Sequence, residues 1–232
     1  TAIDDSSAHF QTALYTGNGG TLAVTNDGNS DLQPDFVWAK NRDRDGYHHN
    51  LYDSTRGVSK QLFSNLARDE DDQANGLASF NSDGFTLGSD DSSNYSGDAY
   101  VGWQWKANGG TTSSNTDGAT TSTVQANTTA GFSIVTWTGT QANTTLGHSL
   151  GVAPEVVIVK SRSAAGAWMV FHTGLGNNAK TLAVDSDRAE ITEDDPWYSF
   201  ANTAPTSTVF SVGAGNTTNG SSRTFVTYCF AE

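Results

Sequence analysis

The segment with the most reactive side chains is residues 42–57, RDRDGYHHNLYDSTRG. It holds two histidines, two tyrosines and three aspartates, all of which can hydrogen-bond a ligand. Because neighbouring strand residues point to opposite faces, His48 and His49 are not expected to bind one metal together, and one core and one surface histidine is the competing interpretation. The residues expected to form a ligand site here, if one exists, are His48, Tyr52, Asp53 and Arg56.

Aromatic residues form the second group of candidate ligand-binding residues. In residues 100–107, YVGWQWKA, Trp103 and Trp105 share one face of a predicted strand. We expect both in the core, because an aromatic side chain buries about 150–250 Å². The alternative is an exposed platform that stacks on a sugar ring. The other residues expected to stack on a sugar are Tyr52, Tyr95, Trp168 and Trp197.

Acidic runs occur at residues 69–72, 90–91 and 193–195. None follows the twelve-residue calcium loop pattern, so we expect solvated loops and no metal site. The chain also lacks the serine-elbow, zinc-protease and phosphate-loop motifs. We therefore expect a protein that is not an enzyme and has no cofactor. A carboxylate pair for glycoside cleavage stays open, because such pairs meet only in space.

The amino-acid composition argues against two classes of partner, nucleic acids and membranes. Among 232 residues there are 25 acidic and 12 basic side chains, for a net charge of −13, which would repel a nucleic-acid backbone. No stretch approaches the roughly 20 apolar residues of a membrane helix, so no membrane partner is expected. Cys229 is the single cysteine and leaves no intrachain disulfide.

Short apolar or alternating segments, separated by Gly, Asn, Asp and Ser, predict an all-β fold. Helical turns are considered only at residues 58–66 and 179–183. The predicted strands are residues 10–15, 36–40, 48–52, 85–87, 100–106, 132–137, 156–160, 168–172, 209–212 and 224–230.

The sequence matches itself at nearly constant offsets. Residues 34–42, PDFVWAKNR, align without a gap on residues 154–162, PEVVIVKSR, at an offset of 120. This pattern predicts two tandem, internally duplicated, jelly-roll-like β-sandwich units. The predicted domains are a first repeat at 1–107, a flexible Gly/Ser/Thr/Asn-rich linker at 108–130, and a second repeat at 131–232.

The repeated segment has apolar residues on both faces, which predicts a central strand covered on both faces in each unit. Basic residues follow at the rim of each strand. They could contact a ligand, but we expect salt bridges to acidic residues of the same unit. These residues are Lys40, Arg42, Lys160 and Arg162.

Several motifs together resemble an uncharacterised domain of virion structural proteins from tailed, often marine, bacteriophages. The motifs are LYTGNG (14–19), PDFVWAKNR (34–42), HHNLYDSTRG (48–57), LFSN (62–65), SFNSDGFTLG (79–88) and YVGWQWKA (100–107). The resemblance covers the first repeat closely, and the second through PEVVIVKSR (154–162) and YCFAE (228–232).

The resemblance implies a location on the outer virion surface, in a tail fibre, spike or capsid decoration assembled in the host cytoplasm. The implied role is non-enzymatic host attachment or particle decoration. The expected partners are other virion proteins, a host cell-surface glycan and further copies in a homo-oligomer. The alternatives are a polysaccharide depolymerase and a purely structural oligomerisation module.

Overall fold

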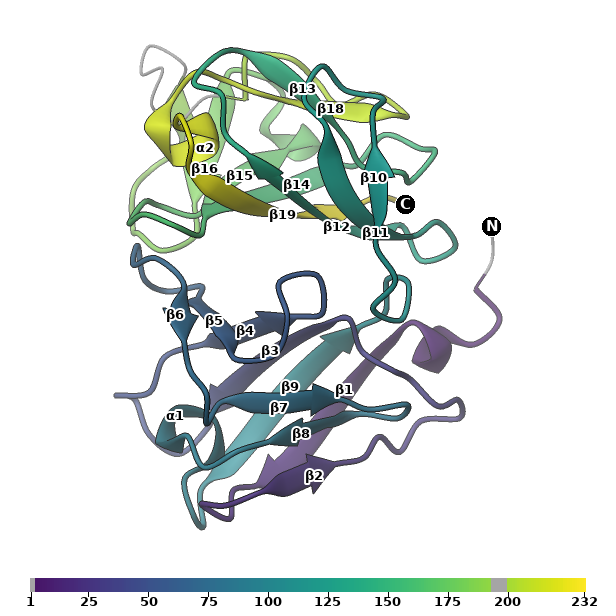
Figure 1. Ribbon diagram of the computed structural model, residues 1–232, viewed down its shortest axis with the longest axis vertical. Helices are drawn as coiled ribbons and strands as arrows, with labels where there is room; N and C mark the ends of the chain where they lie inside the picture. Colours follow the sequence, from purple (N-terminus) through teal and green to yellow (C-terminus); the bar gives the residue numbers. More distant parts are fainter. Residues whose placement is uncertain (1–2, 193–199) are drawn as a thin grey trace. The chain divides into compact units, whose positions relative to one another are not determined.

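The computed structural model describes residues 3–192 and 200–232, so Trp197 and the acidic run at 193–195 lie outside the described residues. The chain forms two compact units (Figure 1). Unit 1 comprises Thr1–Asn65 and Glu70–Gly110, and unit 2 comprises Leu66–Asp69 and Thr111–Glu232. Strands dominate both units and all pairings between named strands are antiparallel, which confirms the predicted all-β sandwich class.

Unit 1 is built from a larger and a smaller sheet. The larger has the strand order β1–β9–β3–β4–β5–β6, and the smaller has the order β2–β8–β7. The bounds are η1 (Ser6–Ala8), β1 (Phe10–Thr16), β2 (Leu22–Val24), β3 (Phe36–Asn41), β4 (Asn50–Asp53), β5 (Lys60–Phe63), β6 (Asp71–Asp72), β7 (Leu77–Phe80), β8 (Phe85–Leu87), α1 (Asp91–Asn94) and β9 (Ala99–Trp105).

Unit 2 follows a similar plan. Its larger sheet has the order β10–β11–β12–β19–β14–β15–β16–β17, and β13 pairs with β18. The bounds are β10 (Ser113–Asn115), β11 (Ser122–Asn127), β12 (Phe132–Thr138), β13 (Thr144–Gly147), β14 (Val156–Ser161), β15 (Met169–His172), η2 (Thr173–Leu175), β16 (Lys180–Ala183), β17 (Ile191–Thr192), β18 (Val209–Val212), α2 (Asn216–Asn219) and β19 (Thr224–Phe230).

The two larger sheets share their central order. The run β1–β9–β3–β4–β5–β6 of unit 1 corresponds to β12–β19–β14–β15–β16–β17 of unit 2. The repeated segments are β3 and β14, each paired with a strand on both sides, so their predicted central place in the sheet is confirmed. The duplication itself stays a prediction from the sequence.

Three expectations were wrong. Residues 58–66 and 179–183 contain strands β5 and β16 and no helical turn, because both segments pair with neighbouring strands. The predicted linker at 108–130 contains β10 and β11, and β11 pairs with β12. Its Thr residues suit a strand, and Val124 lies in the core of unit 2, 1% exposed.

The basic residues of the repeated strands also act differently from the expectation. The Lys40 ammonium donates to the carbonyl oxygen of Asn41 at 2.6 Å, and the Lys160 ammonium donates to that of Gly166 at 2.5 Å. The predicted salt bridges of these lysines are therefore replaced by contacts to backbone carbonyl oxygens. Burial lowers the pKa of Lys160 to about 8.

The core of unit 1 lies between its two sheets. Val37 and Tyr52 from the larger sheet meet Phe85, Leu87 and Leu77 from the smaller one, and each is at most 2% exposed. A β-sandwich of this kind is stabilised mainly by the apolar area removed from water, at about 25 cal/mol per Å².

Strand β9 faces this core in the opposite sense to the expectation. Tyr100, Gly102 and Gln104 point inward and are buried, whereas Trp103 and Trp105 are half-buried on the other face of the sheet. The reason is the space above Gly102: a Cβ atom there would lie 3.0 Å from Cζ of Phe85. The close packing of Phe85 on Gly102 favours this orientation of β9, and the prediction that both tryptophans lie in the core is wrong.

In each unit, a buried asparagine holds the loop that follows the first strand of the shared order. The side-chain amide of Asn94, at the end of α1, donates to the carbonyl oxygens of Gly20 and Gly88 at 2.6 and 2.7 Å. Asn219, at the end of α2, donates to that of Ala142 at 2.7 Å. Both asparagines are 0% exposed, so these hydrogen bonds fasten each short helix to its loop inside the fold.

The same loops begin with a glycine that nothing larger could replace. A Cβ atom on Gly17 would lie 2.2 Å from the carbonyl oxygen of Tyr95, and one on Gly139 would lie 2.2 Å from that of Gly220. No rotation of a side chain relieves such a clash, because both partners are backbone atoms.

We expect Gly17→Ala to lower the free energy of unfolding of unit 1 by about 1–3 kcal/mol, the usual cost of overpacking. Urea denaturation measures this loss. Gly46→Ala is the matched control, because a Cβ at Gly46 meets no atom within 4 Å. Equal stability of the two variants would contradict the close approach described here.

Candidate ligand-binding groove on the tryptophan face

An open groove of about 280 Å³ lies on the outer face of the larger sheet of unit 1. Four side chains line it: Trp38 from β3, Trp103 and Trp105 from β9, and His49 from the loop before β4. We call this feature the tryptophan groove. The two strands bring the indoles together because Trp38 and Trp103 face each other across the ladder.

The rings of the groove are held in fixed orientations. The Trp38 and Trp103 ring centroids lie 6.0 Å apart at 78°, an edge-to-face contact. The indole N–H of Trp38 donates to Nδ1 of His49 at 2.9 Å. Trp105 packs beside Phe36 and Phe10, with centroids 5.2 and 4.9 Å apart. A ligand would therefore meet surfaces that need little reordering, which reduces the entropic cost of binding.

His49 carries its proton on a defined atom. Because Nδ1 accepts the Trp38 hydrogen bond, the neutral ring holds its proton on Nε2. Burial, followed by the positive charge of Lys40, lowers the pKa of His49 below its ordinary value of 6.5. At neutral pH the groove is lined by uncharged side chains.

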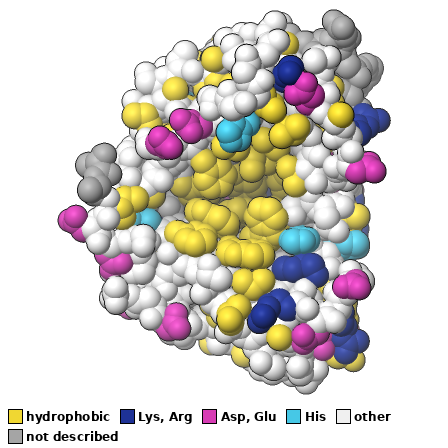
Figure 2. Space-filling view, turned by 180° about the vertical axis from the view of Figure 1, so that it is seen from behind, with side chains coloured by type: hydrophobic (Ala, Val, Ile, Leu, Met, Phe, Trp, Pro, Cys, Tyr) yellow, Lys and Arg dark blue, Asp and Glu magenta, His cyan; other side chains and the backbone are white. Residues whose placement is uncertain are grey.

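Apolar side chains continue beyond the groove on the same face. Phe10 and Leu14 of β1 are 39% and 68% exposed. In the lower part of Figure 2, which draws unit 1, hydrophobic side chains lie next to one another on the surface. Such gathering is typical of an interaction surface.

The groove is suited to binding. Indole faces pack against the apolar face of a sugar ring or of another flat group, and its lining holds no carboxylate and no thiol. Among the described residues, no group of three or more His, Cys, Asp or Glu side chains is arranged to hold a metal ion.

Three of the predicted ligand residues lie in the interior. Tyr52 and Asp53 are 0% exposed and Arg56 is 8% exposed, so none can meet a ligand. The hydroxyl of Tyr52 accepts a hydrogen bond from Gln61 at 2.7 Å, and burial raises the pKa of Tyr52. These residues stabilise the fold, and the prediction that they form a ligand site is wrong.

Arg56 is the centre of a buried charge network. Its guanidinium binds the Asp53 carboxylate, the Glu70 carboxylate at 2.9 Å, and the carbonyl oxygens of Lys60 and Leu51 at 3.0 and 3.1 Å. The network ties β4 and β5 to the segment before β6. The charged residues Asp53 and Arg56 of the segment 42–57 therefore stabilise the fold of unit 1.

The other predicted ligand residues have different environments. His48 is half-buried, with its ring against Phe63 and its Nδ1 2.9 Å from the amide nitrogen of Asn65. Trp168 is 1% exposed and lies parallel to Tyr228, so it offers no stacking surface. Trp197 lies outside the described residues.

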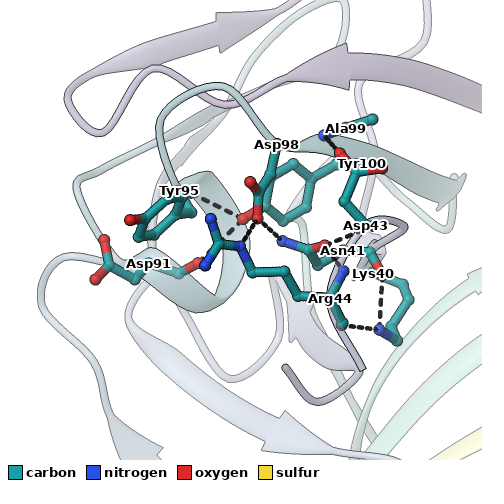
Figure 3. Close-up of polar contacts among 9 residues, drawn as sticks. All are labelled: Lys40, Asn41, Asp43, Arg44, Asp91, Tyr95, Asp98, Ala99 and Tyr100. Carbon is teal, nitrogen blue, oxygen red and sulfur yellow. Dashed lines mark hydrogen bonds and ion pairs between the residues drawn. The ribbon is translucent and has the colours of Figure 1, made fainter. Parts of the chain in front are cut away.

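Tyr95 belongs to a separate polar cluster (Figure 3). The guanidinium of Arg44 lies 4.1 Å above its ring, in a cation–π arrangement. Arg44 also binds the Asp98 carboxylate at 2.6 Å, and Asn41 donates to the same carboxylate at 2.8 Å. These two donors, Arg44 first, hold the pKa of Asp98 below its ordinary value. Tyr95 is half-buried and engaged within the fold, apart from the tryptophan groove.

Two aspartates of the acidic runs form contacts with neighbouring side chains of unit 1. Asp72 pairs with the ammonium of Lys60 at 2.9 Å, and Asp90, directly before α1, accepts a hydrogen bond from the hydroxyl of Ser92 within that helix. Within the described ranges, no helix is long and apolar enough to cross a membrane.

Sequence reasoning missed two residues of the groove. The two apolar faces of residues 36–40 predict coverage of Trp38, and the predicted ligand site includes His48 and not His49. The available indication was the glycine between aromatic residues at Gly102, since a glycine inside a strand often marks the close approach of another layer. That glycine points Trp103 and Trp105 outward, and cross-strand pairing then places Trp38 beside them.

The protein belongs to the all-β sandwich class, and its unit 1 has the tryptophan groove on the outer face of the larger sheet. The chain belongs to a family of domains of unknown function, DUF7483, whose model matches residues 5–232. No curated protein and no solved structure matches the chain.

We expect Arg56→Ala to lower the free energy of unfolding by about 3–5 kcal/mol, because it leaves Asp53 as a buried charge without its partner. Chemical denaturation measures the loss. Arg44→Ala removes an ion pair whose arginine side chain is 48% exposed, so its effect should be much smaller. A loss for Arg56→Ala no larger than for Arg44→Ala would contradict the structural role.

We expect the His49 ring to titrate below pH 6.5 in an NMR titration. Since the folded pKa is depressed, the stabilising effect of neutral His49 is present above pH 6.5 and is lost as the pH falls through the folded pKa. Protonation of Nδ1 breaks the Trp38 hydrogen bond, so the Trp38 indole signal should shift at the same midpoint. A His49 pKa above 6.5, or a Trp38 indole signal that does not change as His49 titrates, would contradict this assignment.

Proposed function

We propose that this protein is a non-enzymatic module of a bacteriophage virion, carried on a tail fibre, a spike or the capsid surface, that attaches the particle to a glycan of the host cell. The observation that carries the binding role is the tryptophan groove: three half-buried indoles and a neutral histidine on one sheet face. The sequence motifs described above support the virion location.

The chemistry of the groove favours a sugar ligand with an apolar ring face. The indole surfaces provide apolar contact area, and the Nε2 proton of His49 provides a hydrogen-bond donor for a sugar hydroxyl. The acidic chain, with a net charge of −13, favours a neutral glycan over a polyanionic one. Because no carboxylate lines the groove, these residues support binding over glycoside cleavage.

We expect the fluorescently labelled protein to bind extracted bacterial surface polysaccharide saturably, without shortening it. Trp103→Ala should weaken binding at least about tenfold, or ~1.4 kcal/mol, because it removes a central ring of the groove. Binding isotherms measure the affinity, and size-exclusion chromatography of the polysaccharide measures its length.

Val58→Ala is the control, because Val58 is an exposed apolar residue of unit 1 (42%) that does not line the groove. It should bind as the wild type does. Polysaccharide shortening would make the protein a depolymerase. Absence of binding across a panel of neutral polysaccharides, or unchanged binding by Trp103→Ala, would contradict the proposed role of the groove.

A further inference from the structure

Strand β1 is an unprotected edge. It ends the strand order of the larger sheet of unit 1, and its pairing with β9 runs without a register shift from Phe10 to Thr16. Its sequence, FQTALYT, contains no charge and no proline. Edge strands are normally protected by charged side chains, proline, bulges or short length, because open backbone groups invite pairing with another chain. β1 has seven residues and none of these protections.

The backbone of β1 presents a row of groups at the open edge. The N–H of Lys106 donates to the carbonyl oxygen of His9, and the N–H of Gly17 donates to that of Asp98, both at 2.9 Å. In an antiparallel pair, the backbone hydrogen bonds to one neighbouring strand recur at every second residue. The N–H and C=O groups of the odd-numbered residues of β1 therefore point toward β9. The N–H and C=O groups of the even-numbered residues therefore point to the open edge. These residues are Phe10, Thr12, Leu14 and Thr16.

The exposed apolar side chains of β1 belong to the same even-numbered residues. Phe10 is 39% exposed and Leu14 is 68% exposed, and they lie two positions before and after Thr12. This spacing is symmetric about Thr12. A second β1 strand running antiparallel would thus place each Phe10 opposite the Leu14 of the other copy.

Unit 2 has a strand at the corresponding position. β12 lies beside β19 as β1 lies beside β9, and its other edge is covered by β11 from Thr123 to Asn127. In unit 1, the chain before β1 is held elsewhere. Asp5 accepts a hydrogen bond from the hydroxyl of Ser30 at 2.6 Å, and the Gln11 amide donates to the carbonyl oxygen of Ser30 at 2.7 Å. Residues 5–8 are therefore fastened to the Ser30 loop and do not supply the missing strand.

We propose that β1 pairs with β1 of a second copy, antiparallel about a two-fold axis at Thr12, to form a continuous sheet across a homodimer. The edge is self-complementary: it has no charge to oppose its own copy, its open backbone groups are satisfied in pairs, and Phe10 packs beside Leu14 across the axis. The net charge of −13 opposes association at long range, so the dimer should tighten as salt screens that repulsion.

Sedimentation velocity over a concentration series, at low and moderate salt, tests the dimer. The wild type should sediment as a dimer, and Leu14→Lys should raise the dissociation constant at least tenfold by placing two like charges at the edge. Leu14 is 68% exposed, so its replacement leaves the core intact. Val58→Lys adds the same charge at another exposed apolar site and should remain dimeric.

A cysteine cross-link tests the register. Facing residues of a hydrogen-bonded antiparallel pair have Cα atoms about 5.5 Å apart, within the range of a disulfide. Thr12→Cys should therefore give a covalent dimer on oxidation, and Val58→Cys should not, while the native Cys229 is buried. A monomeric wild type, a Leu14→Lys variant that dimerises like the wild type, or a Thr12→Cys variant that does not cross-link would each overturn the proposal. Because the readouts are mass and cross-linking, they do not depend on glycan binding.

Discussion

The contact between the Phe85 ring and Gly102 decides which way strand β9 faces. A Cβ atom on residue 102 would lie 3.0 Å from Cζ of Phe85, so any residue larger than glycine would have to displace the ring. Side chains on a strand alternate, and with Gly102 inward both Trp103 and Trp105 must point outward. Stacking of Tyr100 on Tyr15, with centroids 5.0 Å apart, supports the same orientation from the next inward position.

This orientation gives unit 1 polar residues on its inward face and an aromatic outer face. The inward glutamines of β1 and β9 bind a loop: the Gln104 amide donates to Oδ1 of Asn26 at 2.5 Å, and Gln11 accepts the N–H of Gly28 at 3.0 Å. These hydrogen bonds hold the loop of residues 26–30 against the inward face of the larger sheet. The outer face then carries the indoles and the open edge of β1, the two features that point to partners.

The sequence was sufficient to predict the fold class and the central place of residues 36–40. Those features depend on local alternation, which short apolar segments show directly. The direction of β9 could not be predicted in this way, because aromatic residues at alternate positions fit either face until the opposing layer is known. Local composition also misleads at residues 108–130. Their Thr and Ser residues predict a linker, although β11 is held in the sheet by its pairing with β12.

The predicted ligand residues were misplaced for a related reason. Tyr52, Asp53 and Arg56 have side chains that could bind a ligand, but ion pairs with Asp53 and Glu70 bury the Arg56 guanidinium. Partners such as Glu70 are fourteen residues away in sequence, and spacing alone does not reveal them. His49 and Trp38 became a pair only through the fold, eleven residues apart and joined by one hydrogen bond.

The most direct test of the aromatic face as the binding surface is an NMR titration that follows the tryptophan indole N–H signals as a neutral surface glycan is added. The account predicts that the signals of Trp38, Trp103 and Trp105 shift together and saturate, while those of buried Trp137 and Trp168 stay in place. Shifts confined to the buried indoles, or none in the groove at saturating glycan, would contradict it.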